Sequence, residues 1–139
     1  MNDNDDVWTN IFVPGEYTMQ GFRITPFAPV VYQTTVIIPA AWTGSGLQVK
    51  MRADGIYSNA TISINGANVG NHLGGFTPFE FDITAFISST QTPNNITIIV
   101  VGDSLADTLA KGSQYATHDL GGITLSSSLL LSVLQMYML

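Results

Sequence analysis

The stretch "HLGGFTPFEFDIT", which runs from His72 to Thr84, carries the pattern that decides the fold. Two glycines and a proline lead into strict alternation of apolar and acidic residues, in the order Phe79, Glu80, Phe81, Asp82, Ile83. A period of two is typical of a β-strand with one face in a core and the other in water. The stretch therefore predicts a half-buried strand of an antiparallel sheet.

Glu80 and Asp82 also raise the question of catalysis. Both would project from the same side of the strand, roughly 7 Å apart at about 3.3 Å per residue. The acid and base of an inverting glycosidase are separated by a similar distance, about 6.5–9.5 Å. Such a pair also needs one carboxyl desolvated so that its pKa rises, whereas neighbours on one exposed strand share an environment. We therefore expect the two carboxylates to form the solvated face of the strand.

The same period of two recurs at residues 47–52, where Leu47, Val49 and Met51 alternate with polar residues as one core-facing row, and at residues 61–64. β-branched residues dominate residues 30–38 and 96–101. Asn65-Gly66 between two such runs predicts a two-residue hairpin, because both central residues of a type I′ turn need positive φ. Val69 is expected to begin the return strand, and Gly70 to end it. The run at 96–101 predicts a strand that is central in its sheet or buried on both faces.

These strands, separated by Gly, Pro, Asn and Ser clusters, predict an all-β fold, specifically a jelly-roll β-sandwich of about eight strands. We expect residues 32–139 to form the sandwich and residues 1–31 to be an irregular arm. The arm is expected to pack its aromatic residues onto the sandwich: Trp8, Phe12, Tyr17, Phe22 and Phe27. One short helical turn is expected at residues 84–88, with Thr84 as its N-cap.

Composition excludes several functions. The chain has 139 residues, enough for one domain, with a net charge of −6 and no cysteine. Its four bases, Arg23, Lys50, Arg52 and Lys111, are scattered, so no basic stripe exists for a nucleic acid or an anionic membrane. Disulfides and thiolate chemistry are excluded as well. The opening MNDNDD lacks the basic and apolar regions of a signal peptide.

The histidines predict no metal site. His72 and His118 each precede a glycine pair, and no third ligand stands at metal spacing from either. His118 and Asp119 fit a polar binding loop, although a histidine in a surface loop is the commoner case. Phosphate-loop, nucleophile-elbow and metalloprotease motifs are absent. We expect no cofactor and no catalysis by this chain alone.

Several short motifs, taken in order, resemble the N-terminal sugar-binding (jelly-roll) domain of glycoside hydrolase family 2, the β-galactosidase, β-glucuronidase and β-mannosidase group. The matching segments are VPGEY at 13–17, with Tyr17 in place of the usual Trp, and residues 32–44, 54–72, GGFTPFEFDIT at 74–84 and GGI at 121–123. The resemblance covers about residues 8–124. The motifs are short, but their number and order make the match specific.

The resemblance implies a galactose-binding-like β-sandwich attached to a (β/α)₈ barrel, which carries both catalytic glutamates and is absent from this chain. It implies that the partner is that barrel or a carbohydrate. In β-galactosidases a loop before the last strand reaches the rim of the sugar site. That loop corresponds to the neighbourhood of Tyr115, His118 and Asp119, which become the candidate carbohydrate-binding residues. Trp42 and His72 match positions that are structural in the family.

The C-terminus departs from the family, which continues after GGI with an arginine and alternating apolar residues. Here residues 129–139 are largely apolar, and eleven residues are too few for a bilayer, which needs roughly 20. This segment is a core strand of an excised domain, the product of an altered reading frame, or a tail that drives association. We expect this segment to be buried either in the sandwich or against a second copy. In the second case the chain would be a homo-oligomer through its apolar C-terminal segment.

Three functions remain open from the sequence. The first is a non-catalytic accessory domain of a family 2 glycosidase, and it alone is supported by motif order. The second is an independent carbohydrate-binding module, with Tyr57, Tyr115 and Trp42 as the aromatic residues that would stack on sugars. The third is a purely structural or oligomerisation domain.

Overall fold

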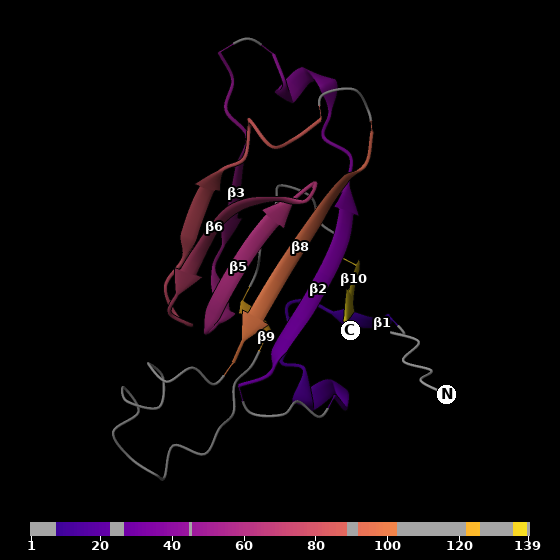
Figure 1. Cartoon of the computed structure of the whole chain (residues 1–139), viewed down its shortest axis with the longest axis vertical. Coiled ribbons are helices and arrows are strands. Elements are labelled where there is room, and N and C mark those ends of the chain that lie inside the picture. Colours follow the sequence, from indigo (N-terminus) through magenta and orange to yellow (C-terminus); the bar gives the residue numbers. More distant parts are fainter. Residues whose placement is uncertain are drawn as a thin grey trace.

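The computed structural model describes residues 8–22, 27–44, 46–88, 92–102, 122–125 and 135–138. Within these ranges the chain forms ten strands in three antiparallel sheets, joined by loops and two short 3-10 turns (Figure 1). The 3-10 turns are η1 (Thr18–Gln20) and η2 (Ala40–Trp42), and they lie at opposite ends of the large sheet. The described part of the chain contains no helix long and apolar enough to cross a membrane.

The large sheet has six strands in the order β1-β10-β2-β8-β5-β6. Its members are β1 (Thr9–Phe12), β10 (Gln135–Met138), β2 (Pro29–Val36), β8 (Asn94–Val101), β5 (Asn59–Ile64) and β6 (Ala67–Leu73). The β-branched run of the sequence is therefore a central strand, because β8 pairs with β2 on one side and β5 on the other. Its burial alternates, so only one of its faces lies in the core.

The second layer consists of two two-stranded sheets. One pairs β3 (Lys50–Ala53) with β7 (Phe79–Asp82), and the other pairs β4 (Gly55–Tyr57) with β9 (Gly122–Leu125). Both layers contribute to one apolar cluster, in which Met51, Ile56 and Ile123 accompany Ile62 and Ile98 of the large sheet. Each fully buried isoleucine contributes about 1.5–3 kcal/mol relative to its exposed state. The expected all-β sandwich is confirmed.

The Asn65-Gly66 hairpin is confirmed, with φ of 51° and 81° at its two central residues. The return strand β6 differs from the prediction, since it starts at Ala67 and runs through Gly70 to Leu73. Gly70 continues the strand because its missing side chain leaves room for the Phe81 ring. A Cβ there would lie 2.6 Å from Phe81 Cε1.

The N-terminal segment packs only part of its aromatic residues. Tyr17 is buried and Phe22 is partly buried against the core, whereas Phe12 and Phe27 are exposed. The strand β1 extends the large sheet by pairing with β10, so four residues of the apolar C-terminal segment belong to the sheet. The other residues of 129–139 lie outside the described ranges. The division into residues 1–31 and 32–139 stays a prediction.

Candidate functional site

The two carboxylates of the opening stretch lie on an exposed charged ladder between β3 and β7. In the strand register Arg52 is opposite Glu80, and Lys50 is opposite Asp82. Lys50 Nζ lies 3.9 Å from Glu80 Oε2, and Arg52 Nη1 donates to Glu80 Oε1 at 3.5 Å. The apolar partners in the strand, Phe79 and Ile83, are buried, as expected. Glu80 and Asp82 therefore form the solvated side of the strand, as the sequence predicts.

This ladder lacks the asymmetry that acid–base catalysis requires. The side chain of Glu80 is 45% exposed and lies between two cations. The guanidinium of Arg52 also donates to Asp54 Oδ1 at 2.6 Å, and that hydrogen bond is the main reason why the pKa of Arg52 is raised. Exposed pairs of this kind add little to stability, because water screens the charges and two long side chains must be held in one geometry. Glu80 and Asp82 are both exposed and share one solvated environment, so the ladder lacks the split environments of an acid–base pair.

Asp82 has a local structural role. Its Oδ1 accepts hydrogen bonds from the Thr84 hydroxyl at 2.6 Å and from the Thr84 backbone N–H at 3.0 Å. These bonds, and then the charge of Lys50, hold the pKa of Asp82 below its usual value. The short turn expected at 84–88 is present at residues 84–86, where the Phe86 N–H donates to Ile83 O at 2.9 Å, but it is not helical and the predicted N-cap role of Thr84 is wrong. Thr84 does not cap a helix because its hydroxyl binds Asp82 and accepts the backbone N–H of Val49 at 2.9 Å.

His72 is part of the packing at the edge of the large sheet. Its ring stacks on Phe79 with a centroid distance of 4.2 Å, and Nε2 lies 3.1 Å from the Thr77 hydroxyl. This position agrees with the structural role that the resemblance implies. Among the described residues, no three histidine or carboxylate side chains are grouped closely enough to hold a metal ion.

The Gly74-Gly75-Phe76 turn places one aromatic ring in solvent. Gly74 adopts φ of 131° and its N–H donates to Ser58 O at 2.8 Å. Phe76 is 68% exposed and contacts the buried Tyr57 edge to face, with ring centroids 5.7 Å apart. Tyr57, a candidate for sugar stacking, is therefore packed, and Phe76 is the exposed ring at this position. The period-two pattern begins only at Phe79, so it gives no sign that Phe76 is exposed.

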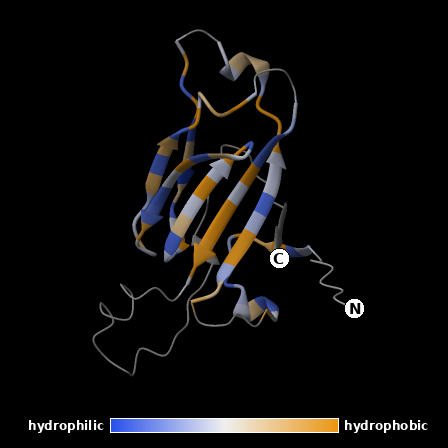
Figure 2. Ribbon diagram, in the orientation of Figure 1, coloured by the Kyte–Doolittle hydropathy of each residue, from blue (hydrophilic) through white to orange (hydrophobic). Residues whose placement is uncertain are grey.

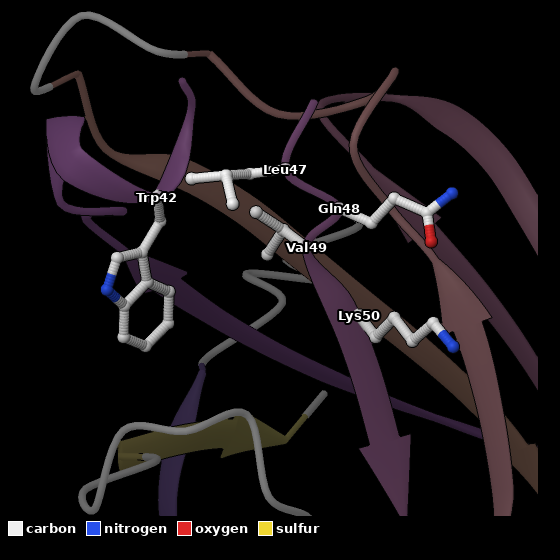
Figure 3. A pocket seen from close by; sticks show the side chains of 5 residues that line it. All are labelled: Trp42, Leu47, Gln48, Val49 and Lys50. Carbon is white, nitrogen blue, oxygen red and sulfur yellow. The ribbon is translucent and has the colours of Figure 1, made fainter. Parts of the chain in front are cut away.

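A hollow of about 240 Å³ lies beside Trp42 at the end of the sandwich that carries η2 (Figure 3). Trp42, Leu47 and Val49 face one another across it, whereas the Gln48 and Lys50 side chains point to the opposite side of the segment (Figure 3). Trp42 is partly buried against the core. The hollow can accept an apolar group or the apolar face of a sugar ring, but its polar side chains do not converge on such a ligand. The sequence identifies Trp42 but not the hollow. The alternation at 47–52 predicts Leu47 and Val49 in one core-facing row, whereas Leu47 precedes β3 and is 52% exposed and only Val49 is buried.

The candidate carbohydrate-binding residues Tyr115, His118 and Asp119 lie outside the described residues. Their proposed grouping in one loop therefore stays a prediction. Of the other aromatic candidates, Tyr57 is buried and Trp42 lines the hollow.

A sequence model of one protein family, described as "Glycosyl hydrolases family 2, sugar binding domain", matches residues 2–132. Among curated relatives, a β-glucuronidase of Paenibacillus borealis is 35% identical over 71 residues, which are 51% of this chain and 11% of that protein. The human β-glucuronidase is 33% identical over 103 residues, 70% of this chain and 16% of that protein. A β-galactosidase of Thermoanaerobacter pseudethanolicus is 42% identical over 55 residues, 40% of this chain and 7% of that protein. The chain thus spans only a small part of the length of these relatives.

The solved structures that superpose on this chain include two β-glucuronidases. The crystal structure of a Bacteroides uniformis β-glucuronidase superposes with a TM-score of 0.65 and 25% identity, covering 97% of this chain and 14% of that one. A Dictyoglomus thermophilum β-glucuronidase superposes with a TM-score of 0.60 at 23% identity, covering 73% of this chain and 18% of that one.

Proposed function

We propose that this chain, which belongs to the sugar-binding domains of glycosyl hydrolase family 2, is a non-catalytic accessory domain of a longer β-glycosidase. One structural observation carries the proposal. The two carboxylates that lie at a catalytic spacing in the sequence are exposed and engaged by Lys50, Arg52 and Thr84. Hydrolysis is then performed by carboxylates elsewhere in the longer protein.

The substrate class follows from the relatives, which are β-glucuronidases and β-galactosidases. We infer that the partner of the domain is a catalytic barrel acting on β-linked glucuronides or galactosides. Tyr115, His118 and Asp119 remain the residues that we propose to reach the rim of the sugar site. A few contacts at such a rim bury only part of a monosaccharide, whereas binding pockets bury 70–90% or more of a small ligand. The isolated domain should accordingly bind sugars weakly.

An independent carbohydrate-binding module is the second candidate, and the hollow beside Trp42 is the observation that favours it. Its lining of Trp42, Leu47 and Val49 offers apolar contact to one face of a sugar ring. Against it stands the orientation of Gln48 and Lys50, whose polar ends point away from the indole (Figure 3). A sugar in the hollow would lack the convergent hydrogen bonds that give orientation and specificity.

Calorimetric titration of the purified chain with phenyl β-D-glucuronide and phenyl β-D-galactoside separates the two candidates. An accessory domain is expected to show no saturable binding below roughly 1 mM, which corresponds to a binding free energy weaker than about −4 kcal/mol. Trp42→Ala should then leave the titration unchanged. Saturable binding well below that concentration, lost in Trp42→Ala while the circular dichroism spectrum is retained, would instead establish a binding module.

A further inference from the structure

The strand β1 forms one edge of the large sheet. In the order β1-β10-β2-β8-β5-β6 it has a neighbour on one side only, and no described strand pairs with its other side. An edge strand presents N–H and C=O groups that can pair with another extended chain, and proteins protect such edges with charged side chains, proline or a β-bulge. The opposite edge strand, β6, has a bulge at Val69, where its register with β5 shifts.

The residues of β1 carry none of these protections themselves. Their sequence, TNIF, contains two polar and two apolar residues but no charge and no proline (Figure 2). Their register with β10 runs without a shift. Ile11 is buried, whereas the ring of Phe12 is 84% exposed. Uncharged segments of high β-propensity are prone to pair with other chains when they lie at an edge, so protection of this edge has to come from elsewhere in the chain.

The side-chain amide of Gln20 pairs with β1 at Phe12. Its Oε1 accepts the Phe12 backbone N–H at 2.8 Å, and its Nε2 donates to the Phe12 carbonyl oxygen at 2.9 Å. One primary amide thus binds both main-chain groups of one residue, as the backbone of a neighbouring strand does. Phe12 is opposite Gln135 of β10 in the register. Since both of its polar groups are bound to Gln20, they face the free edge of the sheet.

The position of Gln20 is fixed by the 3-10 turn η1. The Gln20 backbone N–H donates to Tyr17 O at 3.1 Å. The Glu16 carboxylate accepts the backbone N–H of Met19 at 3.1 Å and so holds the same turn. Gly15 leaves the room that the amide needs, because a Cβ there would lie 2.6 Å from Gln20 Nε2 and 3.0 Å from the Phe12 carbonyl oxygen. The pairing of Gln20 with β1 therefore depends on a built turn as well as on the amide.

We infer that the Gln20 side chain closes the free edge of the large sheet and keeps β1 from pairing edge to edge with a second copy of this chain. This inference goes beyond the accessory role and does not rest on it. Edge-to-edge pairing would continue the sheet from one copy into the next, and it would use the main-chain groups of Phe12. Gln20 occupies these groups with a side chain that cannot itself extend the sheet.

Sedimentation velocity of the whole chain over roughly 10–500 µM, where small interfaces dissociate, tests this inference. Gln20→Ala should form dimers at concentrations roughly tenfold or more below those that the wild type requires, because a pairing copy no longer has to displace two hydrogen bonds. Gln48→Ala is the matched control, since Gln48 is exposed and lies beside the hollow at the other end of the sandwich. It should associate as the wild type does.

Two further variants identify the surface that associates. Gly15→Ala should reproduce the effect of Gln20→Ala, because its methyl group displaces the Gln20 amide from Phe12. Asn10→Lys, added to Gln20→Ala, should return association to the wild-type level. The backbone of Asn10 faces the same edge as that of Phe12, two residues on, and a lysine on an edge strand discourages pairing.

Amide hydrogen exchange of Phe12 reports the pairing with Gln20 directly. It should be roughly two- to tenfold faster in Gln20→Ala than in the wild type, as expected for the loss of one hydrogen bond. Equal exchange in the two proteins would overturn the inference, and so would a Gln20→Ala that is folded by circular dichroism and associates no more than the wild type. If Gln20→Ala does not fold, Gln20→Met, which keeps the length of the side chain without its amide, takes its place in both measurements.

Discussion

Gly75→Ala is expected to lower the free energy of unfolding by about 2–3 kcal/mol, which is the upper part of the usual cost of overpacking a well-packed site. A Cβ at this position would lie 2.0 Å from Tyr57 Cδ2 and 2.9 Å from two further ring atoms. The ring cannot move away easily, because Tyr57 is 6% exposed and in a strand that pairs with β9. Urea denaturation of the variant and the wild type at neutral pH measures the difference.

A second glycine in an open site provides the control. Gly44→Ala meets only Leu47 Cδ1 at 3.5 Å, so its free energy of unfolding should stay within about 0.5 kcal/mol of the wild type. Tyr57→Leu should make Gly75→Ala less harmful, which a double-mutant cycle would show as non-additivity. If Gly75→Ala were as mild as Gly44→Ala, the packing of the turn against Tyr57 would be refuted.

Asn94→Ala is expected to destabilise the domain by about 3 kcal/mol. Asn94 is fully buried at the start of β8, and its Oδ1 accepts the Ser88 N–H at 2.6 Å and the Asn65 side-chain amide at 2.9 Å. Its two amide N–H groups are shared among three carbonyl oxygens, those of Val36, Ser88 and Thr92, at 3.3–3.4 Å from the nitrogen. Alanine would leave several of these buried groups unpaired, at about 1–3 kcal/mol each where water cannot replace the bond. Thermal and urea denaturation give the magnitude.

Two asparagine variants make this result specific. Asn94→Asp should be at least as destabilising as Asn94→Ala, because its buried carboxyl would face the carbonyl oxygens of Val36, Ser88 and Thr92 with no donor to offer them when ionised. Asn68→Ala removes an exposed asparagine from the hairpin and should change the free energy of unfolding by less than about 0.5 kcal/mol. Equal stability of Asn94→Ala and Asn68→Ala would show that the bonds of Asn94 to Ser88 and Thr92 do not stabilise the domain.

Local sequence patterns predicted the parts of the fold that depend on local chemistry. The alternation at 79–83 gave both the strand and its solvent side, and Asn65-Gly66 gave the hairpin because its backbone requires positive φ. Residues whose roles depend on distant partners were not predictable in this way. Gly70 continues its strand because of Phe81, and Thr84 binds Val49, 35 residues away. The sequence gives no local sign of either partner.

In the candidate site, too, the residues whose roles follow from a local pattern were predictable and those whose roles depend on distant packing were not. The structural reading of Glu80 and Asp82 followed from their shared environment on one strand, and the cations opposite them confirm it. The exposure of Phe76 and the hollow beside Trp42 depend on how loops pack at the two ends of the sandwich, which periodicity does not encode. The family resemblance compensates for part of this limit, because the order of motifs identifies the domain where single residues do not.

A hydrolysis assay tests the central claim, that this chain serves a glycosidase without performing its chemistry. The purified chain would be incubated with p-nitrophenyl β-D-glucuronide and p-nitrophenyl β-D-galactoside, with Glu80→Gln assayed in parallel. The account predicts no release of p-nitrophenol above the buffer rate by either protein. Release that is retained through purification and abolished in a folded Glu80→Gln would contradict it, because that result would make the exposed carboxylate of β7 catalytic.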